Sequence, residues 1–223
     1  MRVCKQLFVV LAFVLGVVVF GPASSAHAES TGFHSANYVI DFAIQADGKV
    51  NVTENLDVNY ATEPHHGIYR TTQVRFDYDP KPKFERVYTL EHVHVTATDA
   101  SAHTSISDTG RYKVIKIGDA KKTVTGEHHY KITYTLLGTL NAFHDHDEFY
   151  WNAVGFEWPV PIDHTEIHVT APNGIEQVRC FTGPRESKLQ CDAAQLASRV
   201  SPRVDHGQLY PGPTGRDVVW VRV

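Results

Sequence analysis

The chain has 223 residues with 21 basic and 25 acidic side chains, so its net charge is −4 when histidine is neutral. This mildly acidic balance, without any basic cluster, makes nucleic acid and an anionic lipid surface unexpected partners. The length is enough for one large β domain or two small ones.

The N-terminus carries the three parts of a secretory signal peptide, which we place at residues 1–28. Arg2 and Lys5 precede an apolar run from Leu7 to Phe20, and Ala26-His27-Ala28 supplies a small-x-small cleavage site. The run has about fourteen residues, whereas a helix needs roughly twenty to span a bilayer, so we expect cleavage after Ala28 rather than an uncleaved anchor. The chain is therefore predicted to be exported, secreted or at the cell surface, with no membrane span in its mature part.

The remainder divides into a short linker, residues 29–37, and a single domain, residues 38–223. This domain contains two cysteines, Cys180 and Cys191, which lie eleven positions apart. In an oxidising compartment such a pair is expected to form a disulfide that closes a small loop. A redox or metal-binding pair is the alternative, although the spacing is not that of a C-x-x-C motif.

The first two strands are predicted by alternation of apolar and polar residues. One strand starts at Tyr38 and runs to Ile44, Asp47-Gly48 marks a tight turn, and Val50 to Tyr60 form the return strand. Glu54 falls in the apolar phase of the return strand, where an unpaired carboxylate costs several kcal/mol. We therefore predict a structural ion pair between Glu54 and Arg70, since an arginine fork can satisfy both carboxylate oxygens; a catalytic carboxylate is the alternative.

Further strand-like segments recur about every ten residues and are bounded by turn residues. The intervening stretch from Asp99 to Gly110 is interpreted as an irregular polar loop, and Ala193 to Ser198 as a helical turn. This pattern predicts an all-β fold, a mostly antiparallel β-sandwich of the immunoglobulin-like or jelly-roll-like kind. The segments are Thr72–Tyr78, Val87–Thr98, Tyr112–Ile117, Tyr130–Leu136, Thr165–Thr170, Gly174–Cys180 and Asp217–Val223.

One aromatic segment, Glu148 to Ile162, is expected to organise the core, because five of its fifteen residues are aromatic. Gly155 and two prolines exclude a helix, so we interpret it as a strand, a crossing turn and a second strand. An exposed sugar-binding platform is the alternative. The aromatic residues assigned to the core are Phe149, Trp151, Phe156 and Trp158.

The sequence His144-Asp145-His146-Asp147-Glu148 invites a metal-binding interpretation. On an extended chain His144, His146 and Glu148 project to one side and offer two imidazoles and a carboxylate to zinc or copper. A solvated acidic loop is the simpler interpretation, because no further histidine has a recognisable ligand spacing. Glu148 and Glu157 are a possible glycosidase pair only if they face each other across a groove, which a sequence does not reveal.

Several motifs, in this order along the chain, resemble the N-terminal domain of predicted bacterial membrane proteins known as domain of unknown function 2207. The resemblance covers roughly Tyr38 to Val223 and implies a β-sandwich outside the membrane, usually followed by transmembrane helices and a low-complexity tail. Because this sequence stops at Val223, it is expected to be a stand-alone or a truncated form. The resemblance implies no activity. The motifs are Asp47-Gly48 with Val52-Thr53-Glu54, Gly67-Ile68-Tyr69-Arg70, Tyr130-Lys131-Ile132-Thr133-Tyr134, Tyr150-Trp151-Asn152 with Gly155 and Trp158-Pro159-Val160-Pro161-Ile162, and Cys180-Phe181-Thr182-Gly183 with Cys191.

The first functional hypothesis is a non-enzymatic binding or structural module of the bacterial cell envelope, with no catalytic residues and no cofactor. Its expected partner is an envelope protein or a polysaccharide. The second hypothesis is a metal-dependent or sugar-directed hydrolase that uses the region from His144 to Glu157. Convergence of the candidate metal ligands and an open aromatic groove would favour the hydrolase.

Overall fold

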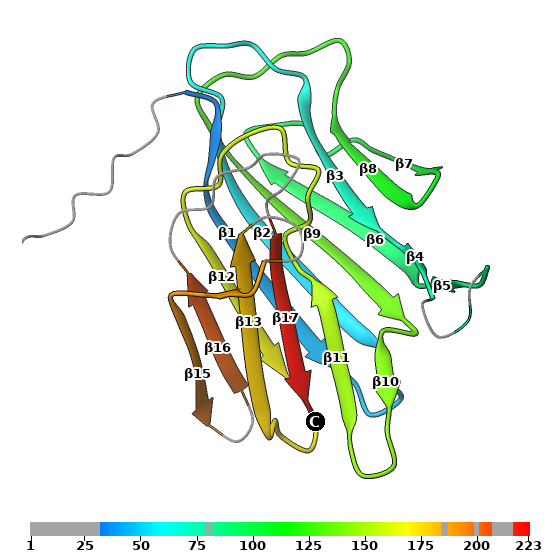
Figure 1. The fold of residues 1–223 in the computed structure, drawn as a ribbon. Coiled ribbons are helices and arrows are strands. Elements are labelled where there is room, and N and C mark those ends of the chain that lie inside the picture. The colour runs from blue at the N-terminus through cyan, green and yellow to red at the C-terminus, as the bar shows by residue number, and fades with distance from the viewer. Residues whose placement is uncertain (1–31, 79–80, 82, 184–186, 199–200, 207–215) are drawn as a thin grey trace, which may run out of the picture.

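The structure is a computed structural model, and among the residues that it describes all regular elements are β-strands, as the sequence predicts (Figure 1). It describes residues 32–78, 81, 83–183, 187–198, 201–206 and 216–223. The predicted signal peptide, residues 1–28, lies outside the described residues, as do the first residues of the expected linker.

The largest sheet has seven strands and is antiparallel except for one parallel pair, β1 with β12. Asp47-Gly48 forms the predicted turn between β1 and β2, and Gly48 has the positive φ of 79° that such a turn needs. The sheet order is β15 (Ala193–Ser198), β16 (Ser201–His206), β12 (Thr165–Thr170), β1 (His34–Ile44), β2 (Val50–Asn59), β9 (Glu127–Leu137) and β6 (Thr89–Thr98).

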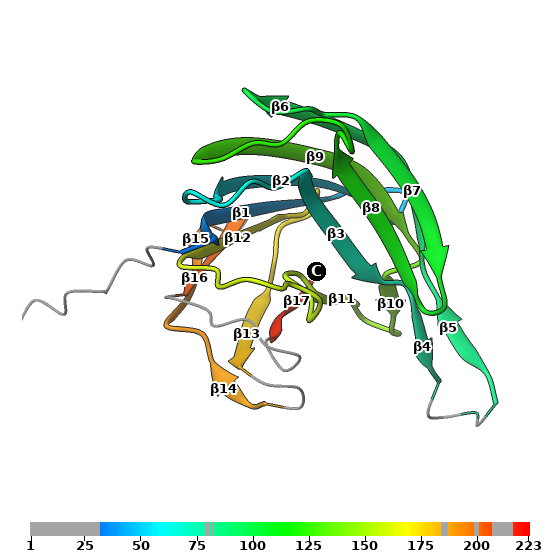
Figure 2. The same cartoon turned by 90° about the horizontal axis from the view of Figure 1, so that it is seen from above.

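Three smaller sheets complete the fold. Figure 2 shows the five-stranded sheet opposite the large sheet, the three-stranded sheet along one flank of the molecule, and the β4–β5 ribbon at the margin. The five-stranded sheet has the order β10 (Leu140–Ala142), β11 (Asp147–Asn152), β17 (Arg216–Arg222), β13 (Gln177–Gly183) and β14 (Leu189–Gln190). The three-stranded sheet consists of β3 (Gly67–Gln73), β8 (Tyr112–Gly118) and β7 (Thr104–Thr109), and the two-stranded ribbon of β4 (Arg75–Asp77) and β5 (Glu85–Val87).

The hydrophobic core lies between the large sheet and the smaller ones. Along β2 every second side chain is buried, so the alternation predicted from the sequence separates a core face from a polar outer face. Phe42 of β1 packs on Phe149 of β11 with ring centroids 5.2 Å apart, and Tyr38 packs on Trp158 at 5.5 Å. Aromatic contacts therefore join the large sheet to the aromatic segment.

The predicted partners Glu54 and Arg70 lie in contact inside this core, and neither is more than 1% exposed. Arg70 Nε donates to Glu54 Oε2 over 2.8 Å, and Nη2 donates to Glu54 Oε1 over 2.9 Å. The Tyr134 hydroxyl donates to Glu54 Oε1 over 2.6 Å, and burial raises the pKa of this hydroxyl well above its usual value, which keeps it protonated. Burial alone would lower the pKa of Arg70, but the Glu54 carboxylate together with Tyr38 and Tyr134 outweighs it and raises that pKa, which keeps the guanidinium charged.

Several expected element boundaries are wrong. The first strand begins at His34, inside the expected linker 29–37, because its early residues pair with the end of β2. The expected loop from Asp99 to Gly110 contains β7, whose sequence is polar except for Ile106 and whose side chains are nearly all exposed, so it shows no alternation. The expected helical turn from Ala193 to Ser198 is β15, which pairs with β16. In each case pairing with the next strand along the chain overrides a weak local signal.

The aromatic segment differs from the predicted strand, turn and strand. Its first half is β11, but the chain after Asn152 is irregular, and Ile162 makes only an isolated parallel bridge to Ser35. The two prolines in this stretch have no N–H to donate to a ladder. Of the four aromatic residues assigned to the core, Phe149, Trp151 and Trp158 are buried, whereas Phe156 is only partly buried.

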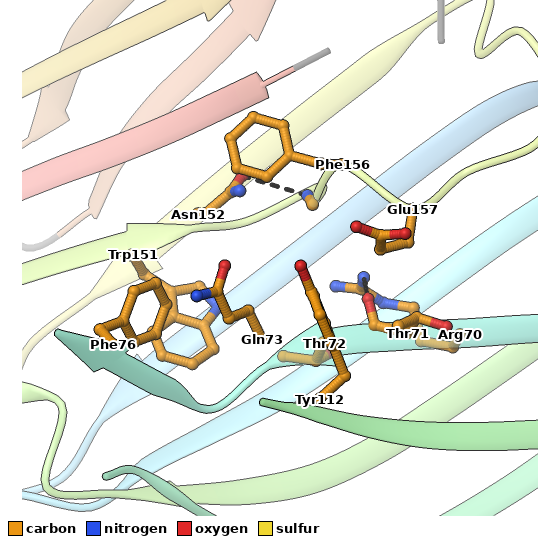
Figure 3. A pocket seen from close by; sticks show the side chains of 11 residues that line it. Arg70, Thr71, Thr72, Gln73, Phe76, Tyr112, Trp151, Asn152, Phe156 and Glu157 are labelled. Atoms are coloured by element: carbon orange, nitrogen blue, oxygen red, sulfur yellow. Dashed lines mark hydrogen bonds between the residues drawn. The ribbon is translucent and has the colours of Figure 1, made fainter. Parts of the chain in front are cut away.

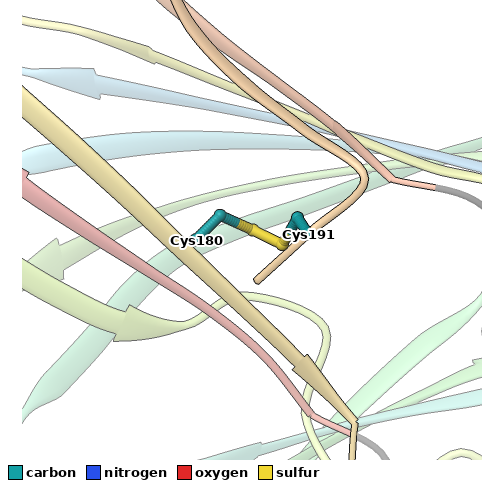
Figure 4. Close-up of a disulfide and its surroundings, with 2 residues drawn as sticks. All are labelled: Cys180 and Cys191. Carbon is teal, nitrogen blue, oxygen red and sulfur yellow. A yellow bond between two sulfur atoms is a disulfide. The ribbon is translucent and has the colours of Figure 1, made fainter. Parts of the chain in front are cut away.

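A disulfide joins Cys180 in β13 to Cys191, which follows β14 (Figure 4). The two Cα atoms are 5.5 Å apart and both cysteines are buried. The backbone N–H of Cys191 also donates to the Cys180 carbonyl over 3.3 Å. The bond therefore ties the edge of the five-stranded sheet to the start of the chain that leads to β15.

On the outer face of the large sheet, His168 bridges two carboxylates and so reinforces the parallel pair of β1 and β12. Its Nδ1 lies 2.7 Å from Asp41 Oδ1, and its Nε2 lies 2.7 Å from Glu166 Oε1. Burial alone would lower the pKa of His168, but the hydrogen bonds to Asp41 and Glu166 outweigh it and raise that pKa. Protonated His168 can donate to both carboxylates at once.

Replacing Glu54 with glutamine is expected to lower the free energy of unfolding by about 3–5 kcal/mol, because it leaves a buried guanidinium without its counter-ion. Urea unfolding at neutral pH measures this loss. The control is Glu85→Gln, which removes an exposed carboxylate 3.5 Å from Arg75 and is expected to change stability little. Equal effects of the two substitutions would contradict a special role for the buried pair.

Removing the disulfide by replacing Cys180 and Cys191 with alanine is expected to lower stability by roughly 2.5–3 kcal/mol, because the short loop gains freedom in the unfolded chain. Reducing the native protein with dithiothreitol should have the same effect in urea unfolding. If dithiothreitol shifts the midpoint of the alanine variant as well, the shift does not come from this bond.

The His168 bridge should make stability depend on pH. Because its pKa is raised in the folded chain, its contribution is complete below the unfolded value of about 6.5 and is lost as pH rises through the raised pKa. The difference in unfolding free energy between the native chain and a His168→Gln variant should therefore shrink from pH 6 to pH 9. A constant difference over this range would contradict the protonated bridge.

Candidate functional site

A pocket opens where the three-stranded sheet meets the aromatic segment (Figure 3). One wall comes from the end of β3, the start of β8 and β4, and the other from β11 and the irregular chain that follows it. The lining residues are Arg70, Thr71, Thr72, Gln73, Phe76, Tyr112, Trp151, Asn152, Gly155, Phe156 and Glu157.

The two walls are joined by the side chain of Arg70. Beyond its pairing with Glu54, Arg70 Nη2 donates to the Ala153 carbonyl over 2.8 Å, and Nη1 donates to the Val154 carbonyl over 2.9 Å. Nη1 also donates to the Thr71 carbonyl over 3.1 Å, within β3 itself. One arginine thus satisfies the carbonyl groups of the irregular chain and fixes it against β3.

Gly155 is required at the point of closest approach. Its φ is +90°, and a Cβ there would lie 3.2 Å from Arg70 Nη1 and 3.5 Å from the Thr71 carbonyl oxygen. Asn152 Oδ1 accepts from the Gly155 N–H over 3.1 Å and so holds this turn. Any other residue would strain the backbone and press on the arginine that joins the walls.

The pocket combines aromatic faces with hydrogen-bonding groups. Phe76, Trp151 and Phe156 form its apolar part, and Figure 3 shows the polar ends of Gln73 and Tyr112 pointing into the space between the walls. Gln73 Nε2 donates to the Arg75 carbonyl over 2.9 Å, which fixes the orientation of the amide. Such a mixture suits a ligand that has both an apolar face and hydroxyl or amide groups.

Two buried polar atoms of the pocket lining need a hydrogen-bond partner. Thr72 Oγ1 and Trp151 Nε1 are each buried, on side chains that are 3% and 2% exposed, and the described part of the chain offers neither of them a partner. An unpaired buried hydroxyl or indole N–H costs about 1–3 kcal/mol. Both atoms would gain from a ligand or solvent oxygen in the pocket.

The three residues proposed as metal ligands are not arranged as a metal site. His146 Nδ1 lies 2.8 Å from Asp145 Oδ1, and its Nε2 lies 3.3 Å from Glu148 Oε1, while His144 is exposed. The hydrogen bond that the His146 ring donates to Asp145 raises the pKa of His146, and the ring stacks on Phe143. Within the described ranges, no three histidine, cysteine or acidic side chains gather so that they could hold a metal ion.

The two glutamates proposed as a hydrolase pair have different surroundings. Glu157 is exposed and lines the pocket, whereas Glu148 is engaged with His146 at the start of β11 and does not line it. Of the two carboxylates that the hydrolase hypothesis requires, only Glu157 lies at this pocket.

The wall that β3, β4 and β8 contribute to the pocket was missed in the sequence. Trp151 was assigned to the core, with a sugar-binding platform as the alternative, and Thr72, Gln73 and Tyr112 were parts of ordinary strand patterns. Gln73 and Tyr112 come together because they are directly opposite each other in the β3–β8 pairing. No local sequence motif indicates this contact. Asn152 was identified as part of the Tyr150-Trp151-Asn152 motif. It accepts a hydrogen bond from the Gly155 N–H, which explains why Asn152 and Gly155 occur in the same motif.

Solved structures with a similar course of the chain include leukotriene A4 hydrolase from Saccharomyces cerevisiae, with 7% sequence identity and a TM-score of 0.48. The matched region covers 91% of this chain and 32% of the hydrolase. Another is the M1 zinc metallopeptidase from Deinococcus radiodurans, at 9% identity and a TM-score of 0.41, covering 84% of this chain and 42% of the peptidase. The chain thus spans less than half of either protein, and likeness at this level carries no functional argument.

A comparison with curated proteins gave no match. In the described part of the chain, no helix has the length and apolar character needed to cross a membrane. The family comparison does give a match, over residues 36–204, to the profile described as "Predicted membrane protein (DUF2207) N-terminal domain". Since the match covers most of the chain, the protein belongs to the DUF2207 family of predicted membrane proteins, to whose N-terminal domain the matched residues correspond.

Proposed function

We propose that the chain is a non-enzymatic binding domain on the outer side of the membrane, and that the pocket beside Arg70 binds a saccharide unit of the cell envelope. The observation that carries the proposal is the pair of buried, unpartnered polar atoms, Thr72 Oγ1 and Trp151 Nε1, in a pocket with aromatic walls. Neither atom forms a hydrogen bond with the surrounding core residues that the structure describes.

A saccharide matches this lining better than an apolar ligand does. Each sugar hydroxyl both donates and accepts, so one ligand can serve the Gln73 amide directly and the buried indole N–H and threonine hydroxyl through a bridging water. The ring of a sugar also has an apolar face of C–H groups, which packs on aromatic side chains such as Phe76 and Phe156. An apolar ligand would leave the two buried polar atoms unpaired.

The walls of the pocket are held in place before any ligand arrives. Arg70, Gly155 and Asn152 fix the irregular chain through side chain to backbone bonds, so little ordering entropy remains to be lost on binding. Export is supported by the predicted signal peptide and by the disulfide, because such bonds persist in oxidising compartments.

Soluble oligosaccharides released from the envelope of the producing cell are expected to bind the purified chain, with a heat signal in isothermal titration calorimetry. Tyr112→Phe and Gln73→Ala should each weaken binding by about tenfold, the loss of one hydrogen bond in a buried site. The matched control is Tyr69→Phe, which removes the same hydroxyl from a residue that is 54% exposed and does not line the pocket.

The control variant should bind as the native chain does. Absence of binding at millimolar oligosaccharide, or equal loss in Tyr69→Phe and Tyr112→Phe, would overturn the proposed site. The ligand should also be recovered intact, so new reducing ends after incubation would contradict the non-enzymatic part and favour the hydrolase hypothesis.

A further inference from the structure

The β4–β5 ribbon extends from the margin of the molecule, beyond the sheets that form the core (Figure 2). Its two strands are short, and backbone bonds continue the pairing past them: Tyr78 N–H donates to the Phe84 carbonyl over 3.0 Å, and Phe84 N–H donates to the Lys81 carbonyl over 3.1 Å. The ribbon is therefore a hydrogen-bonded projection up to its turn.

One face of the ribbon carries ion pairs. Arg111 Nη2 lies 2.6 Å from Asp77 Oδ1 and 3.5 Å from Glu85 Oε1, and Arg75 Nη1 lies 3.5 Å from Glu85 Oε2. These pairs neutralise the charges along the stem. They also fix the ribbon to Arg111, which precedes β8.

The other face is aromatic and becomes more exposed toward the tip. At the base, Phe76 packs on Tyr88 with ring centroids 5.5 Å apart, and the guanidinium of Arg86 lies 5.7 Å from the Tyr88 ring centroid. At the tip, Phe84 is 63% exposed and Tyr78 is 37% exposed. A large exposed aromatic pair on a projecting element is typical of a contact surface.

Two lysines lie at the turn beside this aromatic pair. Lys81 and Lys83 are both exposed, and neither forms an ion pair with an acidic residue that the structure describes. Lys83 adopts a φ of +78°, a conformation that a lysine rarely takes and that fixes the chain just before Phe84. The tip therefore places two exposed lysines beside two exposed rings.

We propose that this tip docks on an anionic lipid bilayer, with Tyr78 and Phe84 in the interfacial region and Lys81 and Lys83 against lipid phosphates. Aromatic side chains favour the membrane interface, and lysines near an anionic surface are attracted to it. The net charge of the whole chain disfavours such a surface, so the attraction has to be local. In the turn two lysines outnumber the single acidic residue, Asp79, and the acidic side chains of the stem are paired with arginines. The proposal is independent of the saccharide pocket.

The experiment is co-sedimentation of the purified chain with vesicles of phosphatidylcholine alone or with 30% phosphatidylglycerol. The native chain is expected to bind the anionic vesicles and to be released by high salt. Lys81→Gln and Lys83→Gln should each weaken binding about fivefold, and Tyr78→Ser with Phe84→Ser should abolish it. All variants share one N-terminus, so differences between them arise at the hairpin.

Matched controls change the same residue types elsewhere on the surface. Lys131→Gln alters an exposed lysine of β9, and Ile106→Ser alters a side chain of β7 that is 48% exposed, so both should bind as the native chain does. Far-UV circular dichroism confirms that each variant is folded. No binding to anionic vesicles, equal loss in the controls, or hairpin-dependent cross-linking to an envelope protein without vesicle binding would overturn the proposal.

Discussion

The buried ion pair of Glu54 and Arg70 is the interaction on which both the fold and the candidate site depend. It joins β2 of the large sheet to β3 of the three-stranded sheet, and the remaining donors of the same guanidinium hold Ala153 and Val154. A buried charge pair is seldom the most stable choice when compared with apolar packing. Its value here is positional, because five guanidinium donors can satisfy a carboxylate and several carbonyl groups in a fixed geometry.

This explains why the aromatic segment is irregular after β11. A continuous strand would have turned these carbonyls toward a neighbouring strand, but Arg70 takes that place and Gly155 lets the backbone approach it. The irregular stretch leaves Phe156 partly buried and Glu157 exposed, both lining the pocket. The pocket is thus a consequence of how one arginine is satisfied.

The sequence was sufficient to predict features that follow from the alternation of apolar and polar residues, or from one charged residue at an apolar position. The all-β class, the turn at Asp47-Gly48 and the family are confirmed, and Glu54, the one acid in an apolar phase, lies against Arg70. The short hairpin strands β7 and β15 were missed because their polar or small residues show little alternation. The pocket was missed for another reason, since Gln73 and Tyr112 become neighbours only through the β3–β8 register.

The position of Phe76 links the pocket to the projecting ribbon. Phe76 lines the pocket from one side, packs on Tyr88, and belongs to β4, whose continuation ends in the exposed pair Tyr78 and Phe84. The ion pairs of Arg111 hold the stem of the ribbon to the chain just before β8, which carries Tyr112 into the same pocket. A ribbon fixed at its base in this way cannot move far without displacing a pocket wall, so docking of its tip on a surface would also fix the distance of the pocket from that surface.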